Sequence, residues 1–159
     1  MSKTYSGGCQ CGAVRFQVEG APKTATICHC RMCQKAVGSY FAAFVAYEIE
    51  KVCITRGEMS VFASSNFAKR GFCSACGTPL SYQWNDRVLS ISIGAFDEPD
   101  HFLPERQYAP ESKVPHFDAA MAAPFVPFSS DPEELAYLDK IQNNQHPDHD
   151  TAVWPLKTL

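Results

Sequence analysis

The sequence has no long apolar run and little helical periodicity. Its longest apolar stretch, residues 40–47, is far shorter than the roughly 20 residues that a membrane-spanning helix needs. Residues 1–8 are polar and lack the apolar core of a secretory signal, and no segment is of low complexity. We therefore expect a cytoplasmic globular protein, and 159 residues are enough for one domain with a substantial core.

The chain also lacks a run of basic residues, a glycine-rich phosphate loop and a Ser/His/Asp order with supporting context. Its formal net charge is −3, and seven thiolates with two divalent metals would make it about −6. A negative protein repels nucleic acid and anionic membranes. We therefore expect neither as a partner, and the hydrolase and nucleotide-binding classes have little support.

Alternating side chains predict short β-strands along most of the chain. In residues 13–19, Val14, Phe16 and Val18 alternate with polar residues, which is the two-residue period of a half-buried strand. Turn formers such as the Arg56-Gly57 pair separate these stretches and favour hairpins over helical crossovers. The pattern predicts a mainly β fold, a sandwich or small barrel, with further strands at residues 40–47, 52–55, 60–63, 80–84 and 89–93.

A helix is predicted only near the end of the chain. Asp131 can cap it, Pro132 suits its first turn, and apolar residues from Leu135 to Ile141 share one face. We expect this short helix to pack on the β domain or on a second subunit of a homodimer. The expected division is a zinc-binding β domain at residues 1–130 and a helix and tail at residues 131–159 that pack on the same domain.

Seven of the eight cysteines fall into three clusters whose members are too close in sequence to pair well as disulfides. Two or three thiolates on one short turn can instead bind the same metal ion. A closed structural zinc site takes four sulfurs, so the remaining three predict a second zinc with one position for water or substrate. The clusters are Cys9 and Cys11; Cys28, Cys30 and Cys33; and Cys73 and Cys76.

The structural site is assigned to Cys9, Cys11, Cys73 and Cys76. Each pair is followed by a glycine, Gly12 or Gly77, which allows a left-handed turn whose N–H groups face the sulfurs. A zinc ion bound by both pairs would tie the first strand to the central hairpin. Part of its binding free energy would then be folding free energy.

Cys28, Cys30 and Cys33 suit a loop around one face of the second zinc. Three thiolates make zinc a weak Lewis acid, but a substrate thiol beside them would be held as a nucleophilic thiolate. Two alternatives stay open: His29 or another residue completes the shell, or both metals are purely structural. Cys53 lies within a predicted strand and is expected to be a small strand residue.

Three motifs occur in a distinctive order: GCQCG at residues 8–12, CHCRMCQK at 28–35 and FCSACGTPL at 72–80. In this order they resemble the glutathione-dependent formaldehyde-activating enzyme family, which includes centromere protein V-like proteins. The similarity runs from about Tyr5 to Phe117. It implies an Mss4-like fold of small antiparallel β-sheets, with one four-cysteine structural zinc and a second zinc bound by three cysteines.

The resemblance also implies an enzyme, a zinc-dependent carbon–sulfur lyase that runs as a synthase, with Cys28, Cys30 and Cys33 at the reactive zinc. Its substrates would be a thiol such as glutathione and a small aldehyde such as formaldehyde. The product would be S-(hydroxymethyl)glutathione or a similar adduct. The alternative is a zinc-stabilised binding module without catalysis, in which both metals are structural and the β surface or the terminal helix binds a protein.

Basic residues lie close to the metal loops in the sequence. Glutathione carries two carboxylates, so its pocket should present cations, although the same cations also compensate thiolate charge. The candidates are Arg31, Lys35, Lys69 and Arg70. His146 and His149 have a metal-like spacing, but in a polar tail we interpret them as an unrelated pair.

Overall fold

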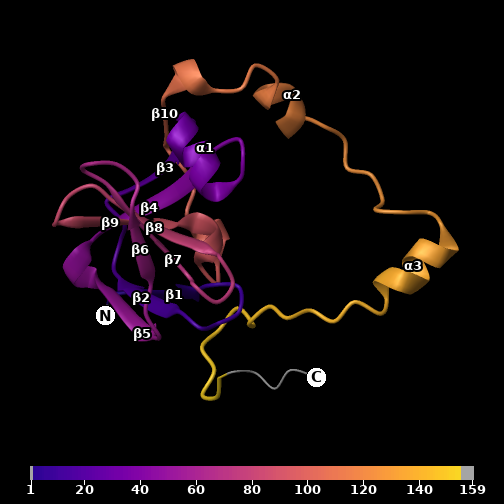
Figure 1. Ribbon diagram of the computed structural model, residues 1–159, viewed down its shortest axis with the longest axis horizontal. Coiled ribbons are helices and arrows are strands. Elements are labelled where there is room, and N and C mark those ends of the chain that lie inside the picture. The colour runs from indigo at the N-terminus through magenta and orange to yellow at the C-terminus, as the bar shows by residue number, and fades with distance from the viewer. Residues whose placement is uncertain (1, 155–159) are drawn as a thin grey trace.

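Two β-sheets account for most of the regular structure in the computed structural model, which describes residues 2–154 (Figure 1). The smaller sheet has the strand order β1-β2-β5, with bounds Thr4–Gly8, Arg15–Glu19 and Val52–Arg56. The larger sheet has seven strands in the order β10-β3-β4-β9-β8-β7-β6. Their bounds are Arg106–Tyr108, Thr24–Cys28, Ala42–Glu48, Val88–Ser92, Pro79–Gln83, Lys69–Phe72 and Ser60–Ala63.

The mainly β class predicted from the sequence is confirmed, but the sheets do not close into a barrel. Strands β2, β4, β5, β6, β8 and β9 fall where alternating side chains predicted them. Among the described residues every strand pair is antiparallel except β10 and β3, which run parallel with Tyr108 opposite Cys28. The larger sheet is therefore mixed and open, with β10 and β6 at its edges.

The helices are short and lie outside the sheets. α1 (Arg31–Val37) follows β3 directly, and its seven residues are too few to reveal a period in the sequence. α3 begins at Pro132 with Asp131 as its cap, as predicted, but it ends at Leu138. None of the helices formed by residues 2–154 has the length and apolar character of a transmembrane span. The others are α2 (Phe117–Met121) and the 3₁₀ segments Ile49–Lys51, Ile93–Ala95, Pro99–His101 and Pro110–Ser112.

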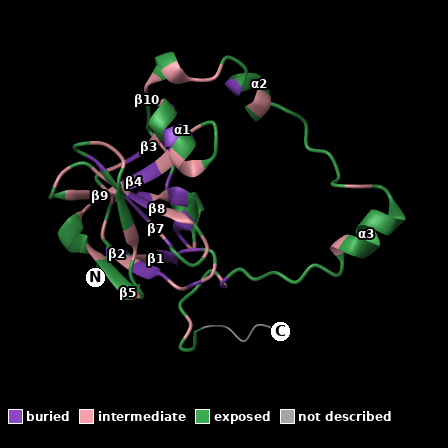
Figure 2. Cartoon of the chain, viewed as in Figure 1, coloured by how far each residue is buried: buried purple, intermediate pink, exposed green. Residues whose placement is uncertain are grey.

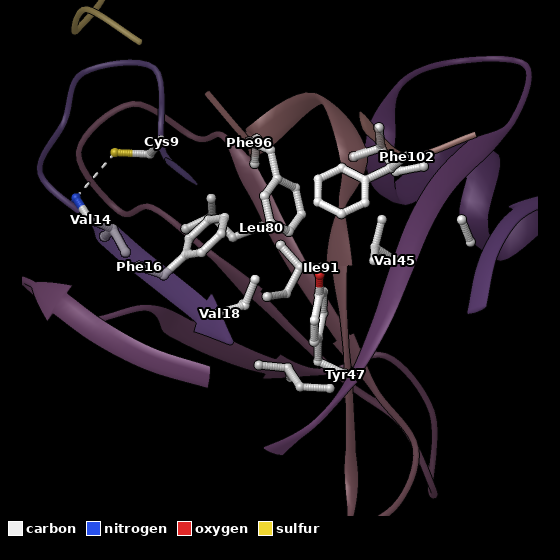
Figure 3. Close-up of a cluster of buried hydrophobic side chains, with 14 of the residues drawn as sticks. Cys9, Val14, Phe16, Val18, Val45, Tyr47, Leu80, Ile91, Phe96 and Phe102 are labelled. Atoms are coloured by element: carbon white, nitrogen blue, oxygen red, sulfur yellow. Dashed lines mark hydrogen bonds between the residues drawn. The ribbon is translucent and has the colours of Figure 1, made fainter. Parts of the chain in front are cut away.

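The main core lies between the two sheets (Figure 3). Phe16 and Val18 of β2 pack in one cluster with Tyr47 of β4, Leu80 of β8 and Ile91 of β9, and all five are buried. Alternate residues of a strand point to the same face, which explains why the apolar half of β2 is the buried half. Burying each such side chain contributes about 2 kcal/mol to the free energy of unfolding.

A buried ion pair fastens the smaller sheet to the segment after β9. Arg15 of β2 is only 2% exposed and donates hydrogen bonds of 2.7 and 2.6 Å to the two carboxylate oxygens of Asp97. Ser6 of β1 donates a third, of 2.6 Å, to the same carboxylate. Burial favours the neutral acid, but the hydrogen bonds from Arg15 and Ser6 outweigh it and hold the pKa of Asp97 below its ordinary value of 3.8.

The chain after α2 leaves the sheets, passes through α3 and returns beside β1 (Figure 1). Most of this arm is exposed, including Tyr137 of α3 and Ile141 beyond it (Figure 2). At its end Asp150 accepts hydrogen bonds of 2.8 Å from Arg15 and 3.0 Å from Gln17. The tail is thus fastened to β2, while the division of the chain after residue 130 stays a prediction.

Replacing Asp97 with asparagine should lower the free energy of unfolding at pH 7 by about 3 kcal/mol, because the buried Arg15 guanidinium loses its buried anion and keeps only the more exposed Asp150. The depressed pKa of Asp97 means that its contribution is complete above the unfolded pKa and is lost as the pH falls through the folded pKa. The difference between D97N and the parent protein should therefore shrink below about pH 4.

Denaturant titrations between pH 7 and pH 2 measure both effects. Glu48→Gln is the matched control, because Glu48 pairs with Lys23 and Lys51 at an exposed site. Surface pairs contribute little, so this variant should unfold much like the parent. Equal losses of stability in the two variants would contradict the role assigned to Asp97.

Candidate metal centres

Four sulfurs from two turns meet beside the smaller sheet. They belong to Cys9 and Cys11, which follow β1, and to Cys73 and Cys76, which lie between β7 and β8. Gly12 and Gly77 have φ values of 76° and 77°, the left-handed conformation that the sequence predicted for them. In the second turn the N–H of Gly77 donates to the carbonyl of Cys73 at 2.8 Å, which folds the chain back and brings the two sulfurs together.

The spacing of these sulfurs fits a tetrahedral metal site. All four lie within 4.8 Å of one another. The Sγ atoms of Cys9 and Cys11 are 3.6 Å apart, and those of Cys11 and Cys73 are 3.9 Å apart. Zn–S bonds of about 2.3 Å in a tetrahedron separate sulfurs by about 3.8 Å, whereas a disulfide joins them at about 2.05 Å. The predicted donors are therefore held at the separation that a metal requires.

The same turns supply hydrogen bonds to the sulfurs. The N–H of Val14 donates to Cys9 Sγ at 3.2 Å (Figure 3), and the Thr78 hydroxyl lies 3.1 Å from Cys76 Sγ. Burial raises the pKa of Cys9 to about 12. Burial also favours the neutral thiol of Cys76, but hydrogen bonds from Thr78 and Cys11 outweigh this effect and lower the pKa of Cys76 to about 6. Keeping the Cys9 thiol ionised at neutral pH therefore needs a cation beside it.

The C-terminal tail covers the first of these turns. His146 is 4% exposed, and its ring packs so closely on Gly12 that a Cβ there would overlap it. The indole N–H of Trp154 donates to the carbonyl of Cys11 at 2.7 Å. Neither His146 nor His149 belongs to the cysteine groups of the described residues, and His146 is a packed residue of the fold.

The other three sulfurs gather where β3 meets α1. Cys28 ends β3, and Cys30 caps α1 by accepting a hydrogen bond of 3.4 Å from the N–H of Cys33. Residues three apart lie on the same side of a helical turn, so Cys33 returns to the side of Cys30. The three sulfurs lie within 4.8 Å of one another. The structure thus brings the seven predicted ligands together in the two predicted groups.

These three cysteines line a cavity of about 500 Å³ on one face of the larger sheet. At its cysteine end Arg70 of β7, 5% exposed, donates from Nη2 to Cys33 Sγ at 3.3 Å and from Nε to Ser64 Oγ at 3.0 Å. The guanidinium carbon also lies 4.8 Å from the centre of the Tyr82 ring. A buried guanidinium in this position compensates part of the charge that three thiolates carry.

Burial and hydrogen bonding give the three thiols different pKa values. Burial raises the pKa of Cys28 to about 12. It also raises the pKa of Cys33, against the lowering effect of the Arg70 guanidinium. At Cys30 burial is outweighed, chiefly by the N–H of Cys33, and the pKa is lowered. An all-sulfur donor set of this kind is soft and suits zinc or another thiophilic ion better than magnesium or calcium.

His29 does not reach the three sulfurs, although it lies between two of them in the sequence. Its ring is buried, with Nε2 2.8 Å from Gln107 Oε1 and its centre 5.0 Å from that of Phe117. A side chain between two inward-pointing neighbours in an extended segment points the other way. His29 therefore anchors β10 and α2, and the alternative in which it completes the metal shell is not supported by the geometry.

The basic residues nearest the metal loops in sequence are divided in space. Arg70 lines the cavity at the three cysteines, whereas Arg31 and Lys35 line a separate hollow beside the end of α1. Sequence reasoning missed Lys23, Thr24 and several aromatic residues of the cavity wall. Residues two and four before Cys28 in β3 share its face, so the strand period would have found Thr24 and Thr26 had β3 been predicted. The missed aromatic residues and methionine are Met32, Tyr82 and Tyr108.

The sequence from residue 4 to residue 112 matches the family described as glutathione-dependent formaldehyde-activating enzyme. The chain belongs to this family. The match includes both cysteine groups and all ten strands of the described structure. The resemblance drawn from the three cysteine motifs is therefore confirmed for the formaldehyde-activating family, while the arm and tail after residue 112 lie outside the matched region.

Two similar proteins extend the comparison. A Schizosaccharomyces pombe (strain 972 / ATCC 24843) protein named as an uncharacterized lyase is 32% identical over 93 residues. These cover 58% of this chain and 66% of that relative, slightly less than two thirds of its length. A crystal structure of a Rhodobacter sphaeroides protein matches with a TM-score of 0.52 at 21% identity, covering 64% of this chain and 98% of that chain. That likeness concerns the fold alone.

Replacing Cys73 with alanine should release one bound metal ion per chain and lower the thermal stability sharply, because the four-sulfur group joins two distant turns. Cys53→Ala is the matched control, since Cys53 is exposed on β5 and belongs to neither group. Metal analysis and thermal denaturation of the two variants measure the effects. Full metal content and an unchanged melting temperature in C73A would show that this group is not a metal site.

Proposed function

We propose that the three-cysteine group is the reactive centre of a zinc-dependent carbon–sulfur lyase that also runs as a synthase. Its substrates are a thiol and a small aldehyde, with glutathione and formaldehyde as the pair that the family's description suggests. The observation that carries the proposal is the position of Cys28, Cys30 and Cys33 in the wall of a cavity large enough for a small molecule. The four-cysteine group is proposed to hold a second, structural zinc.

The chemistry assigned to the cavity is an addition without any change of oxidation state. The thiol sulfur forms a bond to the aldehyde carbon, the π electrons of the carbonyl move to its oxygen, and that oxygen ends with the proton that the thiol lost. The reverse reaction breaks the same carbon–sulfur bond. A zinc ion held by Cys28, Cys30 and Cys33 would supply the positive charge that keeps a substrate sulfur ionised at neutral pH.

Residues around the cysteines hold the charges of this reaction in place. Arg70 is fixed by Ser64 and by the Tyr82 ring, so its positive charge stays beside Cys33 Sγ without reorganisation. Tyr82 packs against the cluster that includes the three cysteines and lines the same cavity. We assign its phenol the hydrogen bond to the aldehyde oxygen, where negative charge develops.

Replacing Cys30 with alanine should remove one metal equivalent and abolish turnover while the domain stays folded, because the four-cysteine group is left intact. Exchange spectroscopy by NMR with glutathione and formaldehyde measures turnover above the uncatalysed rate. Circular dichroism and metal analysis report the fold and the remaining ion. Full activity in C30A would refute the assignment, and X-ray absorption showing four sulfurs on both metals would favour a binding module.

Tyr82→Phe should lower kcat by about 10- to 100-fold, because it removes one hydrogen bond to the developing oxyanion. The metal content should not change, since the phenol is not a ligand and the ring that supports Arg70 is kept. Phe72→Leu is the control for a ring change outside this cavity, because Phe72 lines a different pocket. An unchanged kcat in Y82F would remove Tyr82 from the mechanism.

A further inference from the structure

The floor of the cavity beside the three cysteines is a row of small side chains on the larger sheet. In the sheet register Thr24 of β3 lies opposite Ala46 of β4, Ala46 opposite Ser90 of β9, and Ser90 opposite Tyr82 of β8. Cys28 lies four residues along β3 from Thr24, a distance of about 13 Å in an extended strand. Between them lies the pair of Thr26 and Phe44, so a molecule attached at the cysteine end passes the Phe44 ring before it reaches the row of small side chains.

Aromatic and other apolar residues form the walls above this floor. The rings of Phe44 and Tyr82 have centres 6.0 Å apart, and Trp84, Met32 and Tyr108 complete the rim. Trp84 is 60% exposed, although an indole is among the side chains that gain most from leaving water. A flat, uncharged group placed on the floor would cover these rings and take their surface out of water.

The cavity offers few charged side chains to a charged ligand. The described residues that line it include two cationic side chains, Arg70 and Lys23. Arg70 is committed to Cys33 Sγ and Ser64 Oγ, and Lys23 Nζ lies 2.9 Å from Glu48 Oε1. Glutathione would bring two carboxylates and an ammonium group into this space. For them the described lining residues offer one lysine in a weak, exposed pair and no carboxylate. Placing a charge there without a partner is costly.

We infer that the cavity selects a thiol whose body is uncharged and about the size of an aromatic ring, in preference to glutathione. The inference rests on the thiol chemistry proposed above and names the class of thiol. The sulfur lies at the cysteine end, the ring lies on the floor between Phe44 and Trp84, and Lys23 keeps its pair with Glu48 at the far end. The reaction with formaldehyde is the same balanced addition, so no further reactant is needed.

Benzyl mercaptan and glutathione, each with formaldehyde, are the probes for this selectivity. NMR exchange rates above the uncatalysed background should give a kcat/KM at least tenfold higher for benzyl mercaptan. Trp84→Ala should lower that value by about tenfold, mainly through KM, while the metal content stays unchanged. Phe67→Ala, an exposed aromatic change that is not among the cavity residues, should have no effect.

A second readout tests the cavity without any turnover. Benzyl methyl sulfide has the same body but no thiol proton, and its binding can be followed by NMR line broadening and by the shift of the melting temperature. The parent protein and Phe67→Ala should bind it, whereas Trp84→Ala should bind about tenfold more weakly. Ala46→Phe places a ring on the floor and should abolish binding, with metal content and melting temperature showing that the variant is folded.

The outcomes separate the selectivity from the reaction. Faster turnover of glutathione that falls in Lys23→Gln would overturn the selectivity and leave the proposed function in place. Faster reaction of glutathione with benzaldehyde than of benzyl mercaptan with formaldehyde would also overturn it, because the ring would then belong to the aldehyde. Binding of the sulfide through Trp84 with no turnover of either thiol would support the apolar selectivity and overturn the proposed reaction.

Discussion

The cluster of four sulfurs is the constraint on which the rest of the structure depends. Cys11 and Cys73 lie 62 residues apart in sequence but 3.9 Å apart at their sulfurs, so two turns that share no strand pairing are joined at one point. The first turn leads into β2 of the smaller sheet, and the second connects β7 and β8 of the larger one. Joining them fixes how the sheets face each other, and the apolar core fills the space between them. Two further contacts stabilise this region: the buried ion pair of Arg15 and Asp97, and the hydrogen bond from the His146 N–H to the carbonyl of Gln10.

The two cysteine groups differ in the number of sulfurs and also in the neighbouring groups that offset their negative charge. Around the four-cysteine group, the neutral donors that offset charge come from the turns themselves, through the Val14 N–H and the Thr78 hydroxyl. Around the three-cysteine group a full positive charge is supplied by Arg70. Four thiolates with one divalent ion would carry a charge of about −2, and three thiolates would carry about −1. The charge of the four-cysteine group is offset by neutral dipoles, and that of the three-cysteine group is offset by a cation.

Much of the architecture follows from the sequence, and the missed parts have physical causes. The strands with one apolar face, such as β2 and β9, alternate visibly because their other face is wetter. β7 reads Lys69-Arg70-Gly71-Phe72 and gives no such signal, because its buried side chain is an arginine that is stabilised by a sulfur. β10 is an exposed edge strand, and α1 is capped by a cysteine sulfur where a Ser, Thr, Asp or Asn is the usual sign of a helix start. The grouping of the seven cysteines was predictable from their spacing, but the partner of His29 was not, because Gln107 of β10 lies 78 residues away in the sequence.

Arg70 links the architecture of the three-cysteine group to the kind of molecule that the cavity can accept. A guanidinium can serve a sulfur group or a substrate carboxylate, but here two of its five N–H donors are bound to Cys33 and Ser64 and its face packs on Tyr82. Moving it to an incoming carboxylate would leave the charge of the sulfur group uncompensated in a buried site, which costs more than the new ion pair returns. The same contact that steadies the three cysteines therefore removes a cation from the ligand-binding surface. What remains along the sheet is a floor of small residues between aromatic walls, and that surface discriminates by shape and by the absence of charge on the ligand.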